Sequence, residues 1–121
     1  MNRTITAPAI LLRAEGAILL AASLLLYYQI GASWLLFVLL LFAPDLSMLG
    51  YLAGKPAGAA IYNLAHTYAE PATLALYGVL GGSALALALG LIWLAHIGMD
   101  RLLGYGLKYT TDFKDTHLGR V

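Results

Sequence analysis

Four long apolar segments dominate the sequence and limit the folds that are open to it. They cover residues 9–28, 34–52, 57–80 and 84–105, and each approaches the roughly 20 apolar residues that a helix needs to cross a bilayer. Four spans use roughly 80 residues, and a fifth would leave too few for the connections. We therefore predict an all-α polytopic membrane protein. Residues 1–105 would form a four-transmembrane-helix bundle with short turns, and residues 106–121 a short polar tail.

The composition supports a membrane protein and excludes several functions. Charged residues make up 11% of the chain, against about 25% in soluble domains. The chain has no cysteine, which excludes disulfides, thiolate metal ligands and a cysteine nucleophile. A formal net charge of +1 provides no basic surface for nucleic acid. The expected partner is the lipid bilayer, and the sequence leaves a homo-oligomer open.

The basic residues predict which way the spans point. In a four-span topology, the side that holds both termini and the second loop contains all of them: Arg3, Arg13, Lys55, Arg101, Lys108, Lys114 and Arg120. The two turns on the opposite side contain none. Because lysine and arginine concentrate on the cytoplasmic side of membrane proteins, we expect both termini to be cytoplasmic.

Six acidic and histidine side chains lie inside the predicted spans, where an isolated charge costs roughly 2.5–3.5 kcal/mol. They are Glu15, Asp45, His66, Glu70, His96 and Asp100. At about 1.5 Å per residue, five of them fall in one layer of the cytoplasmic half, and Glu70 lies deeper. Since residues four apart share a helical face, we expect His66 to lie beside Glu70, with Asn63 on the same face, and His96 beside Asp100.

This group of side chains predicts a metal site. Four carboxylates and two imidazoles match the ligand inventory of metal centres in four-helix bundles. The ion would be a divalent metal such as zinc, iron or manganese, in a mononuclear or dinuclear centre. We assign its ligands to Asp45, His66, His96 and Asp100. Glu15 and Glu70 are predicted to act as the general base or to orient a ligand, with Asn63 and Arg101 as supporting polar groups.

The same side chains allow three other interpretations. Arg13 or Arg101 could neutralise the carboxylates in a buried ion-pair network. The two histidines could bind a haem axially. Alternatively, Glu15, His66 and Asp100 could relay protons in a small proton-coupled carrier, which with four spans would need a dimer.

Two prolines and a third histidine bear on the same region. Pro44 and Pro71 free the carbonyls of Leu40 and Thr67, which predicts kinks or a cavity at membrane depth. His117, in the tail, is either solvated or folded back as a further ligand.

Several segments resemble a known family. Residues 42–51, 62–68, 95–109 and 116–119, with their Pro-Asp-Leu-Ser and Ala-His-Ile-Gly-x-Asp-Arg motifs, are similar to a bacterial family of four-span integral membrane proteins, domain of unknown function 4260. The resemblance implies the fold and a multi-pass location in the bacterial cytoplasmic (inner) membrane. It implies no activity. A looser similarity, to membrane-bound metal-dependent hydrolases, rests on His and Asp residues near helix ends and is an analogy of fold.

These observations favour a metal-dependent hydrolase acting on a lipid-like small molecule. A bound metal would lower the pKa of a water molecule and polarise the substrate oxygen. The non-enzymatic carrier is the alternative that the sequence leaves open.

Overall fold

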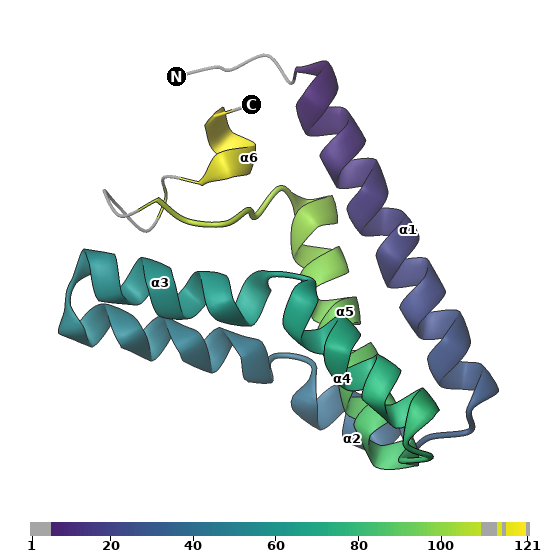
Figure 1. Cartoon of the computed structure of the whole chain (residues 1–121). Helices are drawn as coiled ribbons and strands as arrows, with labels where there is room; N and C mark the ends of the chain where they lie inside the picture. The colour runs from purple at the N-terminus through teal and green to yellow at the C-terminus, as the bar shows by residue number, and fades with distance from the viewer. Residues whose placement is uncertain (1–5, 110–113, 115, 121) are drawn as a thin grey trace.

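The structure is a computed structural model that describes residues 6–109, 114 and 116–120. Its helices are α1 (Ala7–Gln29), α2 (Trp34–Leu40), the 3-10 helix η1 (Ala43–Ala53), α3 (Lys55–His66), α4 (Ala69–Leu80), α5 (Ala84–Leu103) and α6 (His117–Arg120), and Figure 1 shows their arrangement. The part of the chain described here contains no strand beyond an isolated bridge between Lys108 and Thr116. The predicted all-α bundle is confirmed.

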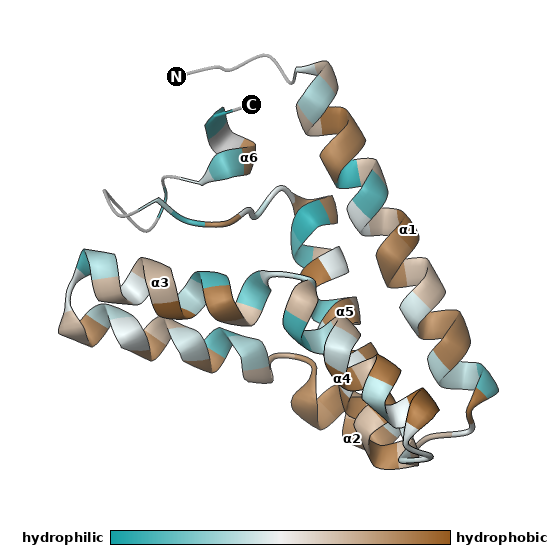
Figure 2. Ribbon diagram, viewed as in Figure 1, coloured by the Kyte–Doolittle hydropathy of each residue, from teal (hydrophilic) through white to brown (hydrophobic). Residues whose placement is uncertain are grey.

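Three stretches of the described chain are long and apolar enough to cross a membrane. They are Ala7–Gln29, Trp34–Ala53 and Ala84–Leu103, and each coincides with a predicted span. Large apolar side chains such as Ile18, Leu25 and Leu39 are exposed on them, as expected where lipid replaces water. Figure 2 shows the apolar colouring along α2 and much of α1, and polar residues near α6 and the end of α5. The cytoplasmic placement of the termini stays a prediction.

The segment predicted as a third span, 57–80, is divided into two helices. α3 ends at His66 and α4 begins at Ala69, with Thr67 extended between them (φ −95°, ψ 154°). Pro71 explains the break, because a proline cannot donate to the carbonyl four residues earlier and its ring clashes with that carbonyl, here Thr67. Pro71 instead lies in the first turn of α4, where no such bond is required. Each half has 12 residues, too few to cross a bilayer alone.

Pro44 divides the second span in the same way. α2 ends at Leu40, four residues before it, and η1 begins at Ala43. The Asp45 amide then donates to the carbonyl of Phe42 over 3.0 Å. The two prolines therefore end helices where the sequence predicted, and each break lies next to a predicted metal ligand.

α5 is the central helix. It packs against α1 and α4, and most of its length from Ala86 to Arg101 is buried. The crossing with α1 is close at Gly98 and Gly16, since a Cβ on Gly98 would lie 2.8 Å from the Gly16 carbonyl oxygen. Small residues permit this approach of two helix backbones in membrane proteins.

η1 and α3 form a separate hairpin. The two helices pack against each other, and Figure 1 shows the hairpin projecting sideways from the direction of α1. The start of η1 and the end of α3 lie together at its base. That base contacts α5. The helix interruptions before η1 and after α3 therefore lie next to the central helix.

Candidate metal centre

Four of the predicted site residues converge at this junction. Asp45 comes from the start of η1, His66 from the last residue of α3, and His96 and Asp100 from successive turns of α5. Their ligand atoms all lie within 4.8 Å of one another. Both histidines are fully buried, whereas the Asp100 side chain is 11% exposed and that of Asp45 is 31% exposed. This group can hold a metal ion.

Five of the six distances among the four ligand atoms are close to those around a tetrahedral ion. The His66 Nε2 and His96 Nε2 atoms lie 3.1 Å apart. Asp45 Oδ1 lies 3.2 Å from the first and 3.1 Å from the second, and Asp100 Oδ2 lies 3.5 Å and 3.2 Å from them. Tetrahedral ligands about 2.0–2.1 Å from a zinc ion are separated by about 3.3–3.4 Å. The two nitrogens are therefore spaced from each other and from each carboxylate oxygen like ligands of one ion, and all four atoms lie within 4.8 Å of one another.

The hydrogen bonding of His66 sets its tautomer. Its Nδ1 lies 2.8 Å from the Tyr62 carbonyl oxygen, which can only accept, so Nδ1 carries the proton and donates. In the neutral ring, Nε2 then has no proton, and its lone pair is directed at the carboxylates. A histidine that donates Nδ1–H to a carbonyl and offers Nε2 is the usual arrangement of a metal-bound imidazole. The Tyr62 ring also stacks on His66, with centroids 3.8 Å apart.

His96 also directs its Nε2 into the group. Its ring faces the main-chain carbonyl of Leu41, but its buried Nδ1 forms no hydrogen bond of ordinary geometry within the described residues. The Leu41 carbonyl is available because Pro44 lacks an N–H and the Asp45 amide donates to Phe42 instead. The proline break thus leaves an acceptor beside His96 that could fix the same tautomer as in His66.

Side chains of α5 fix the end of α3 that carries His66. The last carbonyls of a helix have no partner within it. Trp93 Nε1 donates to the Ala65 carbonyl over 2.6 Å, and Arg101 Nη2 donates to the His66 carbonyl over 3.0 Å. Arg101 Nη1 donates to the Tyr105 carbonyl over 3.2 Å. The predicted supporting residue Arg101 therefore holds main chain in place beside the centre.

A cavity of about 350 Å³ opens beside the four ligands. Its polar lining consists of Asp45, Tyr62, Asp100, Tyr105 and Lys108, and its apolar lining of Phe42, Met48, Met99 and Leu103. Cavities that bind small molecules begin at about 300 Å³ and combine apolar walls with a few polar groups. Both carboxylates of the centre face this space, so a ligand in the cavity would reach the centre from their side.

Lys108 brings a buried positive charge to the cavity. Its main chain is held by Asn63, which donates from Nδ2 to the Lys108 carbonyl (2.8 Å) and accepts from the Lys108 amide at Oδ1 (2.6 Å). The Lys108 Nζ atom lies 4.5 Å from the centroid of the Tyr62 ring. Burial lowers the pKa of Lys108 from its ordinary value, while Asp100 and Asp45 act in the opposite direction. The predicted supporting residue Asn63 therefore holds the main chain of Lys108 against α3, in the C-terminal segment that follows α5.

Two predicted site residues lie outside this group. Glu70, in the first turn of α4, accepts a hydrogen bond from the Thr67 hydroxyl, and the break after His66 separates it from the α3 face. Glu15 is exposed and lines an apolar groove with Tyr68 and Leu94. Neither carboxylate lines the cavity beside the four ligands.

The geometry weakens two of the alternative interpretations. Axial haem ligands lie on opposite faces of a porphyrin, and two nitrogens 3.1 Å apart leave no room for the ring between them. In the described residues, Asp45 and Asp100 form ion pairs with the two histidines and not with Arg101, which donates to carbonyls. His117 is not among the grouped residues, and its Nδ1 accepts from the Leu107 amide over 2.7 Å.

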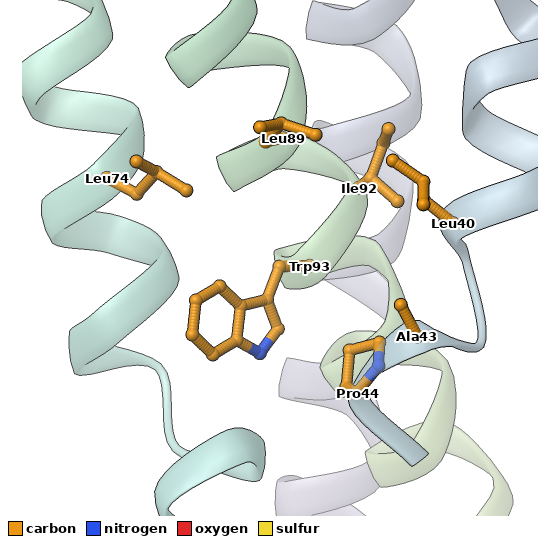
Figure 3. A pocket seen from close by; sticks show the side chains of 7 residues that line it. All are labelled: Leu40, Ala43, Pro44, Leu74, Leu89, Ile92 and Trp93. Atoms are coloured by element: carbon orange, nitrogen blue, oxygen red, sulfur yellow. The ribbon is translucent and has the colours of Figure 1, made fainter. Parts of the chain in front are cut away.

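An apolar groove lies on the other side of Pro44. It has a volume of about 320 Å³ and is lined by Leu40, Ala43, Pro44, Leu74, Leu89, Ile92 and Trp93. Figure 3 shows these side chains from α4, α5 and the break between α2 and η1, with the Trp93 indole between Leu74 and Pro44. The groove offers no group that could act in chemistry, so the polar cavity is the candidate reaction space.

Comparison with known families identifies one family that covers most of the chain. One family model, described as Domain of unknown function (DUF4260), matches residues 9–121. The chain belongs to this family. The matched region includes all four ligands and the cavity residues of the candidate centre, so the site lies within the family's domain. The comparisons with curated proteins and with solved structures give no match.

Sequence reasoning missed two residues of the site. Lys108 was assigned to the polar tail, and Tyr62 was not singled out. The spacing of Tyr62 and His66, four residues apart on α3, was a signal that the two rings would stack. The burial of Lys108 depends on the fold of the C-terminal segment over α3, which no local pattern indicates.

Proposed function

We propose that this protein is a membrane metalloprotein that binds one divalent metal ion, zinc in the first place, through Asp45, His66, His96 and Asp100. The observation that carries the proposal is the convergence of two imidazole Nε2 atoms, which lie 3.1 Å apart, with two carboxylate oxygens that each lie 3.1–3.5 Å from both nitrogens. Two imidazoles and two carboxylates suit zinc, and also iron or manganese.

Proton sharing alone explains this convergence poorly. With Nδ1 of His66 donating to Tyr62, a neutral His66 presents only a lone pair to three neighbouring acceptor atoms. Two imidazolium rings would instead direct two N–H groups at each other across 3.1 Å. At most one proton fits between the two nitrogens, whereas a cation satisfies all four ligand atoms at once.

The activity we propose for the centre is hydrolysis of an ester in a lipid-like substrate. A bound divalent ion lowers the pKa of a water molecule and polarises a substrate oxygen. The cavity supplies the space for the substrate, and Asp45, as the more exposed ligand at its edge, is placed to accept a proton. Four protein ligands make a closed site, so a substrate or water would enter as a fifth ligand from the cavity side.

The decisive experiment is elemental analysis of the protein purified in detergent. The wild type should contain about one zinc per chain. His66→Gln and His96→Gln should each lose most of it, because a missing imidazole leaves three ligands. The third histidine provides a matched control, since His117→Gln removes an imidazole outside the centre and should retain the metal.

The outcome distinguishes whether the protein binds a metal from which metal it binds. Iron or manganese in place of zinc would keep the centre and change the ion. A wild-type protein without metal, which also takes none up when zinc is supplied, would refute the proposal. Equal metal content in all three glutamine variants would refute it as well. Cobalt substitution provides a second measurement, because tetrahedral cobalt has an intense visible spectrum that His66→Gln should alter.

A further inference from the structure

We infer that the hairpin of η1 and α3 lies flat within one leaflet of the bilayer, with a strip of leucines on η1 inserted among the lipid chains. The partner of this strip is hydrocarbon, and the hairpin does not cross the membrane. The inference goes beyond the proposed function and does not depend on a bound metal. It is carried by the exposure of the leucines, by the direction and depth of the hairpin, and by the polarity of the segments around it.

Leucines recur at every third position of η1. They are Leu46, Leu49 and Leu52. A 3-10 helix has three residues per turn, so these side chains lie in line along it, and they are 65–89% exposed. The line that begins with Asp45 instead supplies a candidate ligand and part of the cavity wall, and Gly50 on the remaining line faces Ile61 of α3. The leucine strip is therefore the side of η1 that the described elements leave uncovered.

The hairpin leaves the bundle sideways and close to one end of α5. Figure 1 shows η1 and α3 projecting away from the direction of α1, and their main contacts are with each other. The base contacts His96, which is seven residues before the end of α5 at Leu103, a distance of about 10 Å. One leaflet contains about 15 Å of hydrocarbon. With α1 and α5 crossing the bilayer, the hairpin lies parallel to its surface within one leaflet.

The length of α4 gives a similar depth. Its 12 residues cover about 18 Å, and α4 ends at the turn before α5, on the opposite side of the membrane. In a hydrocarbon core about 30 Å thick, the start of α4 beside the hairpin then lies about 12 Å from the side where α5 ends. α2 and α4 are thus half-spans that lead to and from a hairpin in the plane of the membrane.

Polar and apolar segments are ordered along the same direction. Figure 1 shows α3 between η1 and the C-terminal segment, and Asn63 of α3 binds the main chain of Lys108 in that segment. Polar residues lie near α6 in Figure 2, whereas the hairpin from Leu46 to Leu64 has a single charged residue, Lys55. Helices that lie in the membrane interface have the same arrangement, with a polar side toward water and an apolar side in the lipid.

The size and character of the leucine strip favour lipid over a second copy of the chain. Three leucines expose less than the roughly 800 Å² per partner that a stable protein interface buries. Their exposure is similar to that of Ile18 and Leu25 on α1, a helix long and apolar enough to cross a membrane. Hydrocarbon covers such side chains without the close shape complementarity that a protein interface requires.

The test is the depth of spin labels placed along the strip. The chain has no cysteine, so Leu46→Cys, Leu49→Cys and Leu52→Cys each provide a single labelling site. The full chain is reconstituted in phosphatidylcholine vesicles, and the accessibility of each label to oxygen and to a water-soluble nickel chelate gives its depth. We expect three similar depths with high accessibility to oxygen. A continuous helix crossing the bilayer would spread the three labels over about 9–12 Å.

Three exposed positions on α1 provide the matched control. Leu11→Cys, Ile18→Cys and Leu25→Cys are seven residues apart on a predicted span and have similar exposure. The label at position 18 should lie about 10 Å deeper than the other two. A near-UV circular dichroism spectrum like that of the wild type shows that each labelled protein is folded.

Each other result would overturn the inference. Depths that change steadily along η1 would make residues 34–52 a continuous span. Labels reached mainly by the nickel chelate would place the strip in water, and labels reached by neither reagent, with spin–spin broadening, would place it against a second copy. Elemental analysis of the same labelled proteins tests the proposed function separately, because none of these positions is a candidate ligand.

Discussion

Arg101 on α5 donates a hydrogen bond from Nη2 to the main-chain carbonyl of His66 on α3 over 3.0 Å. The carbonyl belongs to the last residue of its helix, which has no partner within the helix, and the side chain of the same residue is a candidate metal ligand. A positive charge at a helix C-terminus also stabilises the helix, because it interacts favourably with the helix dipole. The contact thus ties the position of the His66 ring to the central helix.

Replacing this arginine should loosen the centre without removing a ligand. Arg101→Met leaves the buried carbonyl of His66 without its donor, which costs about 1–3 kcal/mol, and also removes the donor to the partly buried Tyr105 carbonyl. We expect a lower thermal midpoint in detergent and zinc affinity reduced about 10- to 100-fold, as for other groups that position metal ligands. Competition with a chelator measures the affinity.

Arg101→Lys is the informative comparison for that prediction. Lysine keeps the positive charge but not the planar fork that reaches two carbonyls at once. Its zinc affinity should lie between those of the wild type and Arg101→Met. Zinc affinity that is unchanged in Arg101→Met, in protein with a wild-type near-UV circular dichroism spectrum, would show that the guanidinium does not position His66.

Asn63 should limit the access of a protease to the main chain at Lys108. Its side chain makes two hydrogen bonds with the main chain of Lys108, and together these are worth about 2 kcal/mol. Asn63→Leu should therefore expose the peptide bond after Lys108 to trypsin roughly 5- to 30-fold more often. The rate of cleavage at that bond under native conditions measures the change.

A hydroxyl on α4 supplies the control for this variant. Thr73 donates to the Ala69 carbonyl within one exposed turn, so Thr73→Val also removes a side-chain hydrogen bond but should leave cleavage after Lys108 unchanged. Zinc content should be retained in both variants. Equal cleavage of the wild type and Asn63→Leu would mean that other contacts hold the segment.

The candidate ligands could be predicted from the sequence because each signal was local. Acidic and imidazole groups are costly inside an apolar span, which singled out Asp45, His66, His96 and Asp100. The spacing of His96 and Asp100 placed both on one face of a helix that is unbroken in the structure. Pro44 and Pro71 marked the helix ends that bring Asp45 and His66 to the centre.

The rest of the site depends on long-range packing. The i, i+4 rule requires a continuous helix, so it placed Glu70 beside His66 although the break at Thr67 separates them. The depth estimate counted Glu15 in the same layer as the ligands, but depth along a helix does not fix direction around it, and Glu15 is exposed. The pairing of Asn63 with Lys108 joins residues 45 apart, which no periodic pattern predicts.

The C-terminal segment should lose stability on mild acidification. Burial, and after it the positive charge of Arg101, lower the pKa of His117 from its ordinary value of 6.5. Its Nδ1 accepts from the Leu107 amide, which requires an unprotonated nitrogen. Well above pH 6.5, His117 is unprotonated in both the folded and the opened segment. Below it, the opened segment is protonated before the folded one, so the free energy of opening falls until the pH passes the lowered pKa.

Hydrogen exchange measures this effect directly. Protection of the amides at 105–109, corrected for the intrinsic pH dependence of exchange, should be lower at about pH 5.5 than at about pH 7.5. In His117→Gln the amide oxygen can accept from Leu107 without titrating, so this difference should disappear. A difference of the same size in that variant would assign the pH dependence to another group.

The crossing of α1 and α5 should be sensitive to a single methyl group. A Cβ on Gly98 would lie 2.8 Å from the Gly16 carbonyl oxygen and 2.8 Å from the Leu20 amide nitrogen. Both atoms are main chain and cannot move without shifting α1, so Gly98→Ala should destabilise the bundle by about 1–3 kcal/mol. Ala14→Ser, which adds one atom at an exposed position of α1, should change stability by less than about 0.5 kcal/mol.

Thermal or denaturant unfolding in the same detergent compares the two variants. Equal stability of Gly98→Ala and the wild type would show that the helices do not cross this closely. Because His96 and Asp100 flank Gly98 on α5, the alanine variant should also bind zinc more weakly.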